Sequence, residues 1–153
     1  MSPLITSSIE MNSMNRAFLD TNILVYALMK RRGSLVDHRT EIAEQILCAG
    51  GVVSVQVLSE FCDVLSRKFR VGWSAIEEGM GAISTFCGTA IPLTAETHKA
   101  AFAISRRHQL RIYDSMILAA ATMAGCATVY SEDMQNGQMI EGVRIENPFR
   151  EIS

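Results

Sequence analysis

Four acidic side chains stand where predicted strands end or the following helices begin. They are Asp20, Glu60, Asp114 and Asp133. Carboxylates gathered in one place repel each other, by about 3 kcal/mol for two charges roughly 5 Å apart at an effective dielectric constant near 20. Mg²⁺ or Mn²⁺ reverses the sign of this energy, because these hard cations take oxygen ligands and bridge carboxylates to phosphate oxygens. If the acids converge, hydrolysis of phosphodiester bonds is the natural chemistry.

The elements that would position these acids follow from hydrophobic periodicity and from turn residues. Short β-branched or apolar runs predict strands, and apolar residues at helical spacing predict helices that end at glycines. Strands are predicted at AFLD (17–20), GVVSV (51–55), AIPL (90–93), ATVYS (127–131) and VRIENPF (143–149). Helices are predicted from about Asn22 and over 39–51, 56–70, 73–87, 94–110 and 113–125, with Thr94 as the N-cap of the fifth.

Strands that alternate with helices predict an α/β fold, in which a parallel sheet is covered on both faces. In such a sheet, the strand ends and the starts of the following helices gather at one edge. Asp20 closes the first predicted strand, and Asp133 follows ATVYS. Glu60 lies about one turn into a helix, and Asp114 opens another. The topology therefore predicts that the four carboxylates meet.

Composition limits the class of protein. The chain has 153 residues, of which 48% are hydrophobic, with a net charge of −2, so no global positive field indicates nucleic acid or membrane. Four widely spaced cysteines indicate neither a zinc site nor a disulfide framework. No signal peptide or membrane span is apparent, so a cytoplasmic protein is expected. Residues 1–15 are expected to form a disordered lead, in which Met14 is an alternative start, followed by one domain over 16–153.

Four segments resemble the successive motifs of the PIN-domain family, specifically the bacterial VapC-like toxin ribonucleases. These segments are FLDTNILVYAL, VLSEF, YDSMILAAA and VYSEDMQNGQMIEGVRIENPF. The resemblance extends from about Arg16 to Phe149. It implies a PIN-like α/β/α sandwich with a central parallel sheet, Mg²⁺ or Mn²⁺ as cofactor, and endonucleolytic cleavage of RNA. It also implies a toxin inhibited by a small antitoxin protein, and a homodimer.

The resemblance also assigns residues. The family's acidic positions fall on Asp20, Glu60, Asp114 and Asp133, of which Asp20, Asp114 and Asp133 are expected to bind the metal. Asn22 falls on the polar position beside the first acid, and Ser131 on the Ser/Thr position before the last. The family often has a further Asp where this chain reads ALMKRR, and Asp37 is a candidate substitute.

Basic clusters could contact the RNA backbone. Lys30, Arg31 and Arg32 are preferred, because the helix that carries them begins beside Asp20. They would neutralise phosphates without reading bases. The clusters at 67–70 and 105–108 lie near helix C-termini, where the helix dipole favours cations whatever the function.

Each acid also has a structural interpretation. Asp20 and Asp114 could simply cap helices, and Glu60 could lie on a solvated helix face, although its apolar neighbours indicate a buried carboxylate that needs a partner. Glu132 is read as an exposed acid outside the site. Two rival functions also remain: a PIN-fold RNA-binding module without catalysis, and an aspartyl-phosphate phosphatase or receiver-like domain. The latter usually has a second Asp beside the nucleophile and a Lys on a late strand, and this sequence offers neither.

Overall fold

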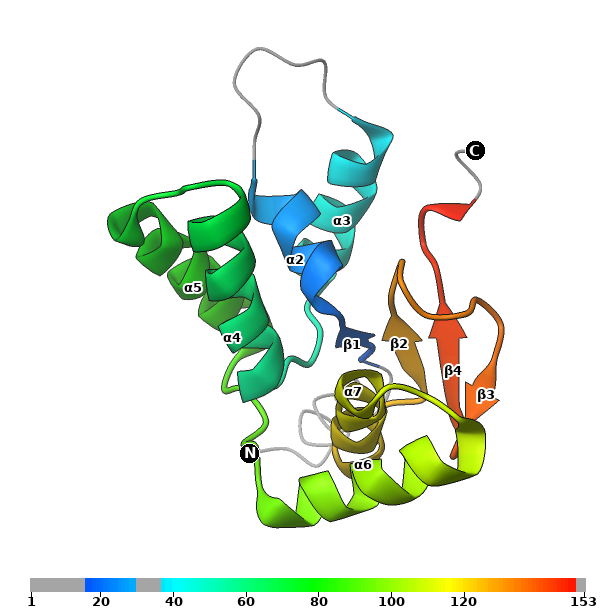
Figure 1. Cartoon of the computed structure of the whole chain (residues 1–153). Coiled ribbons are helices and arrows are strands. Elements are labelled where there is room, and N and C mark those ends of the chain that lie inside the picture. Colours follow the sequence, from blue (N-terminus) through cyan, green and yellow to red (C-terminus); the bar gives the residue numbers. More distant parts are fainter. Residues whose placement is uncertain (1–15, 30–36, 151–153) are drawn as a thin grey trace, which may run out of the picture.

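The computed structural model of the chain describes residues 16–29 and 37–150 (Figure 1). Its elements are, in order, β1 (Phe18–Leu19), α2 (Thr21–Leu28), α3 (His38–Ala49), α4 (Val55–Asp63), the π-helical turn η1 (Val64–Lys68), α5 (Trp73–Cys87), α6 (Ala95–His108), α7 (Ile112–Met123), β2 (Thr128–Tyr130), β3 (Met139–Ile140) and β4 (Val143–Glu146). The α/β class predicted from the sequence is therefore confirmed.

The sheet has the strand order β1-β2-β4-β3. β2 pairs in parallel with β1 and with β4. A strand from the first part of the chain therefore lies beside strands from the last part. Phe18 lies opposite Val129, and Val129 lies opposite Ile145. All three side chains are buried, as expected for a parallel sheet that is covered on both faces. β3 joins β4 as an antiparallel edge strand.

Two of the predicted strands contribute only single bridges to the sheet. Val52 bridges Phe18 and Ser54 bridges Ile91, both in parallel. The run 51–55 cannot extend further, because Ser54 already caps α4 by accepting a hydrogen bond from the Val57 N–H at 3.3 Å. A glycine is required where this run approaches β1, since a Cβ on Gly51 would lie only 2.7 Å from the Leu19 Cγ.

The six predicted helices are all present among the described residues, and several end or begin as their sequences indicated. Thr94 caps α6, since its hydroxyl accepts from the Thr97 N–H at 3.1 Å, and α3 stops at Gly50. The helix predicted over 56–70 differs in part, because α4 passes into the π-helical turn η1 after Asp63.

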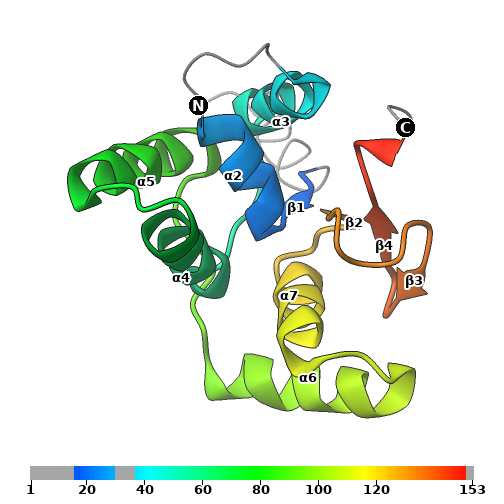
Figure 2. The ribbon, with the colours of Figure 1, turned by 45° about the horizontal axis from the view of Figure 1, so that its top comes forward.

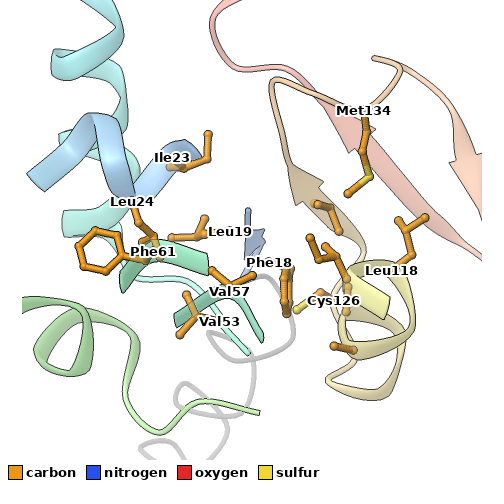
Figure 3. Packing of buried hydrophobic residues seen from close by; sticks show 14 of the residues in the cluster. Phe18, Leu19, Ile23, Leu24, Val53, Val57, Phe61, Leu118, Cys126 and Met134 are labelled. Atoms are coloured by element: carbon orange, nitrogen blue, oxygen red, sulfur yellow. The ribbon is translucent and has the colours of Figure 1, made fainter. Parts of the chain in front are cut away.

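The helices surround β1 from two sides. Figure 2 shows α2, α3, α4 and α5 gathered on one side of β1, and α6 with α7 on another. Figure 3 shows Leu24 and Phe61 packed beside Leu19, while Cys126 lies near Phe18. These side chains are buried, and each buried aliphatic or aromatic side chain contributes about 1.5–3 kcal/mol to folding. The apolar core thus fixes where β1 ends, and with it Asp20.

Two sequence predictions fall outside the described residues. They concern the disordered lead over 1–15 and the basic cluster Lys30, Arg31 and Arg32. Within 16–29 and 37–150, none of the helices combines the length and the apolar character that a bilayer crossing requires.

Candidate active site

All four predicted acids line one cleft of about 820 Å³ at the carboxyl end of β1. Asp20 follows β1, Glu60 comes from α4, Asp114 from the first turn of α7, and Asp133 from the segment after β2. Asn22 lines the same cleft. Residues that are far apart in sequence therefore meet here, as the strand order of a parallel sheet predicts.

Asp20 is the most buried of the four carboxylates, with 5% of its surface exposed. It caps α2, because its Oδ1 accepts the Thr21 N–H at 2.7 Å, and its Oδ2 accepts the Ser131 hydroxyl at 2.7 Å. Burial raises the pKa of Asp20 to about 6, against the lowering effect of these two hydrogen bonds; the charges of Glu60 and Asp133 raise it further. Asp20 is therefore both a cap and a carboxylate inside a negative field.

Ser131 connects the first and last acids of the cleft. Its side chain is fully buried, donates to Asp20, and accepts the backbone N–H groups of Asp133 and Met134 at 3.2 and 3.3 Å. The hydroxyl therefore holds the turn after β2 against the end of β1. The resemblance assigned Ser131 a supporting role. These contacts show what Ser131 supports, namely the Asp20 carboxylate and the turn that carries Asp133.

Glu60 has partners at both of its carboxylate oxygens. The Thr21 hydroxyl donates to Oε2 at 2.6 Å, and Gln56 Nε2 donates to Oε1 at 2.9 Å. Gln56 also donates to the backbone carbonyl of Tyr113 at 3.1 Å. The expectation that Glu60 needs a partner is confirmed, and the solvated-face interpretation is wrong. Gln56, which the sequence analysis did not single out, links α4 to the start of α7.

We expect Gln56→Leu to lower the free energy of unfolding by about 1–3 kcal/mol, because leucine leaves a carboxylate oxygen of Glu60 and the Tyr113 carbonyl without their donor. Urea unfolding at neutral pH measures the loss. The matched control is Gln45→Leu, an exposed glutamine on α3, whose change should stay within about 0.5 kcal/mol. Equal effects of the two substitutions would show that the Gln56 contacts contribute nothing to stability.

Asp114 is not a cap. The N-cap of α7 is Arg111, and Asp114 is the third residue of the helix, so the capping interpretation of Asp114 is wrong. Burial raises the pKa of Asp114, the charge of Arg111 opposes this, and the charges of Asp133 and Glu60 add to the rise. A half-buried carboxylate in a negative field, with no cap to make, is suited to binding a cation.

Asn22 carries the polar atom of the cleft that remains unsatisfied. Its Nδ2 donates to Asp133 Oδ2 at 3.1 Å, whereas its Oδ1 is buried and has no hydrogen-bond partner. A buried acceptor without a partner is costly, and a cation or its water is a fitting partner for an amide oxygen beside carboxylates. The residues present therefore fit a divalent metal.

The four acids do not form a complete set of metal ligands in this arrangement. Among the described residues, no three acidic, His or Cys side chains are close enough to hold one ion as they stand. Carboxylates without a cation between them repel one another. Moreover, hydrogen bonds from Thr21, Ser131, Asn22 and Gln56 occupy oxygens of Asp20, Glu60 and Asp133.

Glu132 also lines the cleft, contrary to its interpretation as an exposed acid outside the site. Its side chain is 24% exposed, and Arg39 approaches one oxygen at 3.4 Å. The Tyr26 hydroxyl donates to its other oxygen at 2.8 Å. Phe149 packs edge-on against the Tyr26 ring. Glu132 is thus neutralised by neighbours and anchors the segment that carries Asp133.

Two cations line the cleft, Lys68 at the end of η1 and Arg111 before α7. Lys68 belongs to the basic cluster that the sequence analysis ranked below the one at 30–32, and Arg111 was not considered. Asp37, the candidate substitute for the family's further acid, instead caps α3 by accepting the Arg39 N–H at 3.1 Å.

Comparisons with known proteins agree with this architecture. The family model of the PIN domain matches residues 17–135, a range that contains all four acids. The chain is similar to the structure of a toxin–antitoxin complex from Klebsiella pneumoniae, with a TM-score of 0.62 and 23% identity over 86% of this chain and 97% of that one. It is also similar to VapC20 of Mycobacterium tuberculosis, a sarcin–ricin loop cleaving toxin, with a TM-score of 0.59 and 23% identity over 76% and 89%. At this identity the two structures show the fold alone, and they confirm the expected PIN-like fold. No curated protein matches the sequence significantly.

Proposed function

The chain belongs to the PIN-domain family, and from this premise we propose that it is a Mg²⁺- or Mn²⁺-dependent endoribonuclease. The observation that carries the proposal is the convergence of Asp20, Glu60, Asp114 and Asp133 on one cleft. An acidic cleft of this kind has little use without a cation, because the charges repel one another. Burial raises the pKa of Asp20 and of Asp114, and the charges of Glu60 and Asp133 add to the rise at both. The fold alone would not supply a substrate.

Asp20, Asp114 and Asp133 would hold the metal, and the unpartnered Oδ1 of Asn22 lies in the same cleft. When bound, such a cation supplies neutralisation of the scissile phosphate and activation of a water for in-line attack on phosphorus. Ser131 and the Thr21 N–H keep Asp20 in one orientation. Fixed carboxylates of this kind pre-organise the site before the substrate arrives.

Glu60 acts from beside the metal ligands. Both of its oxygens receive hydrogen bonds, from Thr21 and from Gln56, so we assign it the roles of adding negative charge and of orienting protons in the cleft. Through Thr21 it is connected to the residue that follows Asp20, and through Gln56 to the residue that precedes Asp114. Glu60 thus ties the two ends of the ligand set together.

The test is incubation of the purified, partner-free protein with a mixed RNA pool containing Mg²⁺, Mn²⁺ or EDTA, followed by mapping of the cut ends. We expect cleavage at internal sites with either metal and none with EDTA. RNA that is bound but never cut would favour a non-catalytic RNA-binding module. A phosphoryl group retained on Asp20 after incubation with a small phosphodonor would favour the aspartyl-phosphate alternative.

We also propose that the enzyme is the toxin of a toxin–antitoxin pair and forms a homodimer. The support for the toxin is that one similar structure is a toxin–antitoxin complex and the other a sarcin–ricin loop cleaving toxin, as their names state. The homodimer rests on the resemblance of the sequence motifs to the family. An antitoxin would restrain the enzyme by covering or disrupting the acidic cleft.

Expression of the chain alone in bacteria is expected to arrest growth, and co-expression of a small protein encoded beside it should restore growth. Colony counts after induction measure both effects. The matched control is the same chain with Asp20→Asn, which should be harmless at equal protein levels. Harmless expression of a parent that cuts RNA in vitro would remove the toxin assignment and leave the enzyme assignment intact.

A further inference from the structure

Among the described residues, two aromatic and two basic residues line the acidic cleft and make no side-chain hydrogen bond to its acids. They are Lys68, Phe69, Arg111 and Tyr113. Lys68 and Phe69 come from the end of η1, and the other two from the start of α7. The Tyr113 side chain is 57% exposed. A large exposed aromatic side chain in a cleft that also holds six carboxylates indicates a ligand with both a flat apolar face and polar groups.

The two cations are available to a ligand. Among the described residues, neither Lys68 nor Arg111 forms an ion pair, although six carboxylates line the same cleft. Two of those carboxylates already have cations of their own, Glu132 paired with Arg39 and Asp63 with Arg67. Lys68 and Arg111 are therefore the positive charges in the cleft that can bind an incoming anion.

One cation lies against an aromatic ring, and the other is close to an aromatic residue along the chain. Lys68 Nζ lies 5.4 Å from the centroid of the Phe69 ring, and Arg111 is two residues from Tyr113. Gln56 fixes the backbone of Tyr113 by donating to its carbonyl oxygen, so the ring is presented from a held backbone. A cation next to an aromatic face is the pairing with which proteins bind single-stranded nucleic acids, one group for the phosphate and one for the base.

We propose that these four residues form a nucleotide subsite for an RNA segment with unpaired bases, in which Tyr113 stacks on one base while Arg111 and Lys68 bind phosphates beside it. This rests on the proposed nuclease function, and it adds which side chains bind the base and the phosphates. A base inside a duplex has both faces covered by its neighbours and cannot stack on Tyr113, whereas an unpaired base can. The cations select no sequence, because phosphates are common to every nucleotide.

The experiment measures binding to a fluorescein-labelled single-stranded RNA of about ten nucleotides, within the site sizes of single-strand-binding proteins. Fluorescence anisotropy is recorded with Ca²⁺ present to screen the carboxylates, and the probe is checked on a gel to be uncut. We expect Tyr113→Ala to weaken binding roughly five- to hundredfold, while Tyr113→Phe, which keeps the ring, binds like the parent. A duplex of the same length should bind no better to the parent than to Tyr113→Ala.

Salt dependence separates the cations from the aromatic ring. Each phosphate contact on a single strand contributes about 0.7 to the slope of log affinity against log salt concentration. Arg111→Ala and Lys68→Ala should each lower that slope by about this amount, whereas Tyr113→Ala should leave it unchanged. The matched controls are Lys99→Ala and Phe102→Ala on α6, an exposed cation and a 59% exposed aromatic residue outside the cleft. Neither should change affinity or slope.

The outcomes keep this proposal apart from the proposed function. Cleavage by the parent together with unchanged binding by Tyr113→Ala would overturn the subsite and leave the nuclease in place, and the exposed ring would then belong to a protein contact. Loss of binding in Tyr113→Ala with a parent that never cuts RNA would support the subsite and remove the nuclease. Equal losses in the α6 controls would overturn the assignment of these residues.

Discussion

Asp20→Asn is expected to abolish metal-dependent RNA cleavage in a protein that remains folded. Asparagine keeps the Oδ1 acceptor for the Thr21 N–H, so α2 keeps its cap, but it removes the charge that attracts the cation. Loss of an outer-shell partner of a metal ligand typically costs 10- to 100-fold. Loss of a ligand should therefore lower the cleavage rate by more than about 100-fold. Initial rates with saturating Mn²⁺ measure the effect.

Folding of this variant is checked by circular dichroism, which should resemble that of the parent, and by a thermal melt in EDTA. The amide nitrogen that replaces Oδ2 cannot accept the Ser131 hydroxyl, and the loss of this hydrogen bond opposes the gain from removing a buried charge. The matched control is Asp63→Asn. Asp63 lines the same cleft, but it is 62% exposed and is paired with Arg67. It should keep the parent rate. Equal cleavage rates for Asp20→Asn and the parent would show that the chemistry takes place elsewhere. Equal losses of rate in Asp20→Asn and Asp63→Asn would show that cleavage depends on the total negative charge of the cleft rather than on Asp20.

Asp114→Asn is expected to remove most of the stabilisation that Mn²⁺ gives to the parent. In the parent, a ligand that binds the folded state alone adds about 2.7 kcal/mol at a concentration of 100 times its dissociation constant. Without metal, the variant should be as stable as the parent or more so, because it avoids burying a charge and relieves repulsion from Asp133 and Glu60, which together outweigh the lost attraction to Arg111. The opposing loss of charge–dipole attraction is only about 0.3–1 kcal/mol.

Thermal melts with EDTA and along a Mn²⁺ titration measure both effects. Glu96→Gln is the matched control, because Glu96 is likewise an acid in the first turn of a helix, α6. That variant should lose the charge–dipole attraction and keep the full response to metal. An undiminished rise in melting temperature for Asp114→Asn would remove Asp114 from the ligand set.

The sequence predicted the helices and the central strands because their signals are local. Apolar periodicity and the cap at Thr94 depend on residues within one or two turns. β3 was missed, because two residues with one buried side chain, Met139–Ile140, produce no pattern. The runs 51–55 and 90–93 carry a strand composition, yet only single bridges form, since Ser54 begins a helix at once. How many residues pair depends on tertiary context, which composition does not contain.

The convergence of the acids was predictable for a similar reason, since the edge at which strands end follows from topology. Their partners were not. Gln56 reaches Tyr113 across 57 positions, and Tyr26 reaches Glu132 across 106. Such contacts depend on how side chains are directed after the helices have packed. The same applies to Arg111, whose place in the cleft depends on where α7 begins rather than on any basic cluster.

The Ser131–Asp20 hydrogen bond determines when the site can assemble during synthesis of the chain. Its two residues are 111 positions apart, and β2, which ends at Tyr130, is itself completed by pairing with β4. At roughly 5–20 residues per second on a ribosome, the first carboxylate is made about 6–20 s before its partner. A nascent or prematurely terminated chain therefore carries most of the acids and no assembled site. This order of synthesis delays assembly of the cleft until β4 has been made.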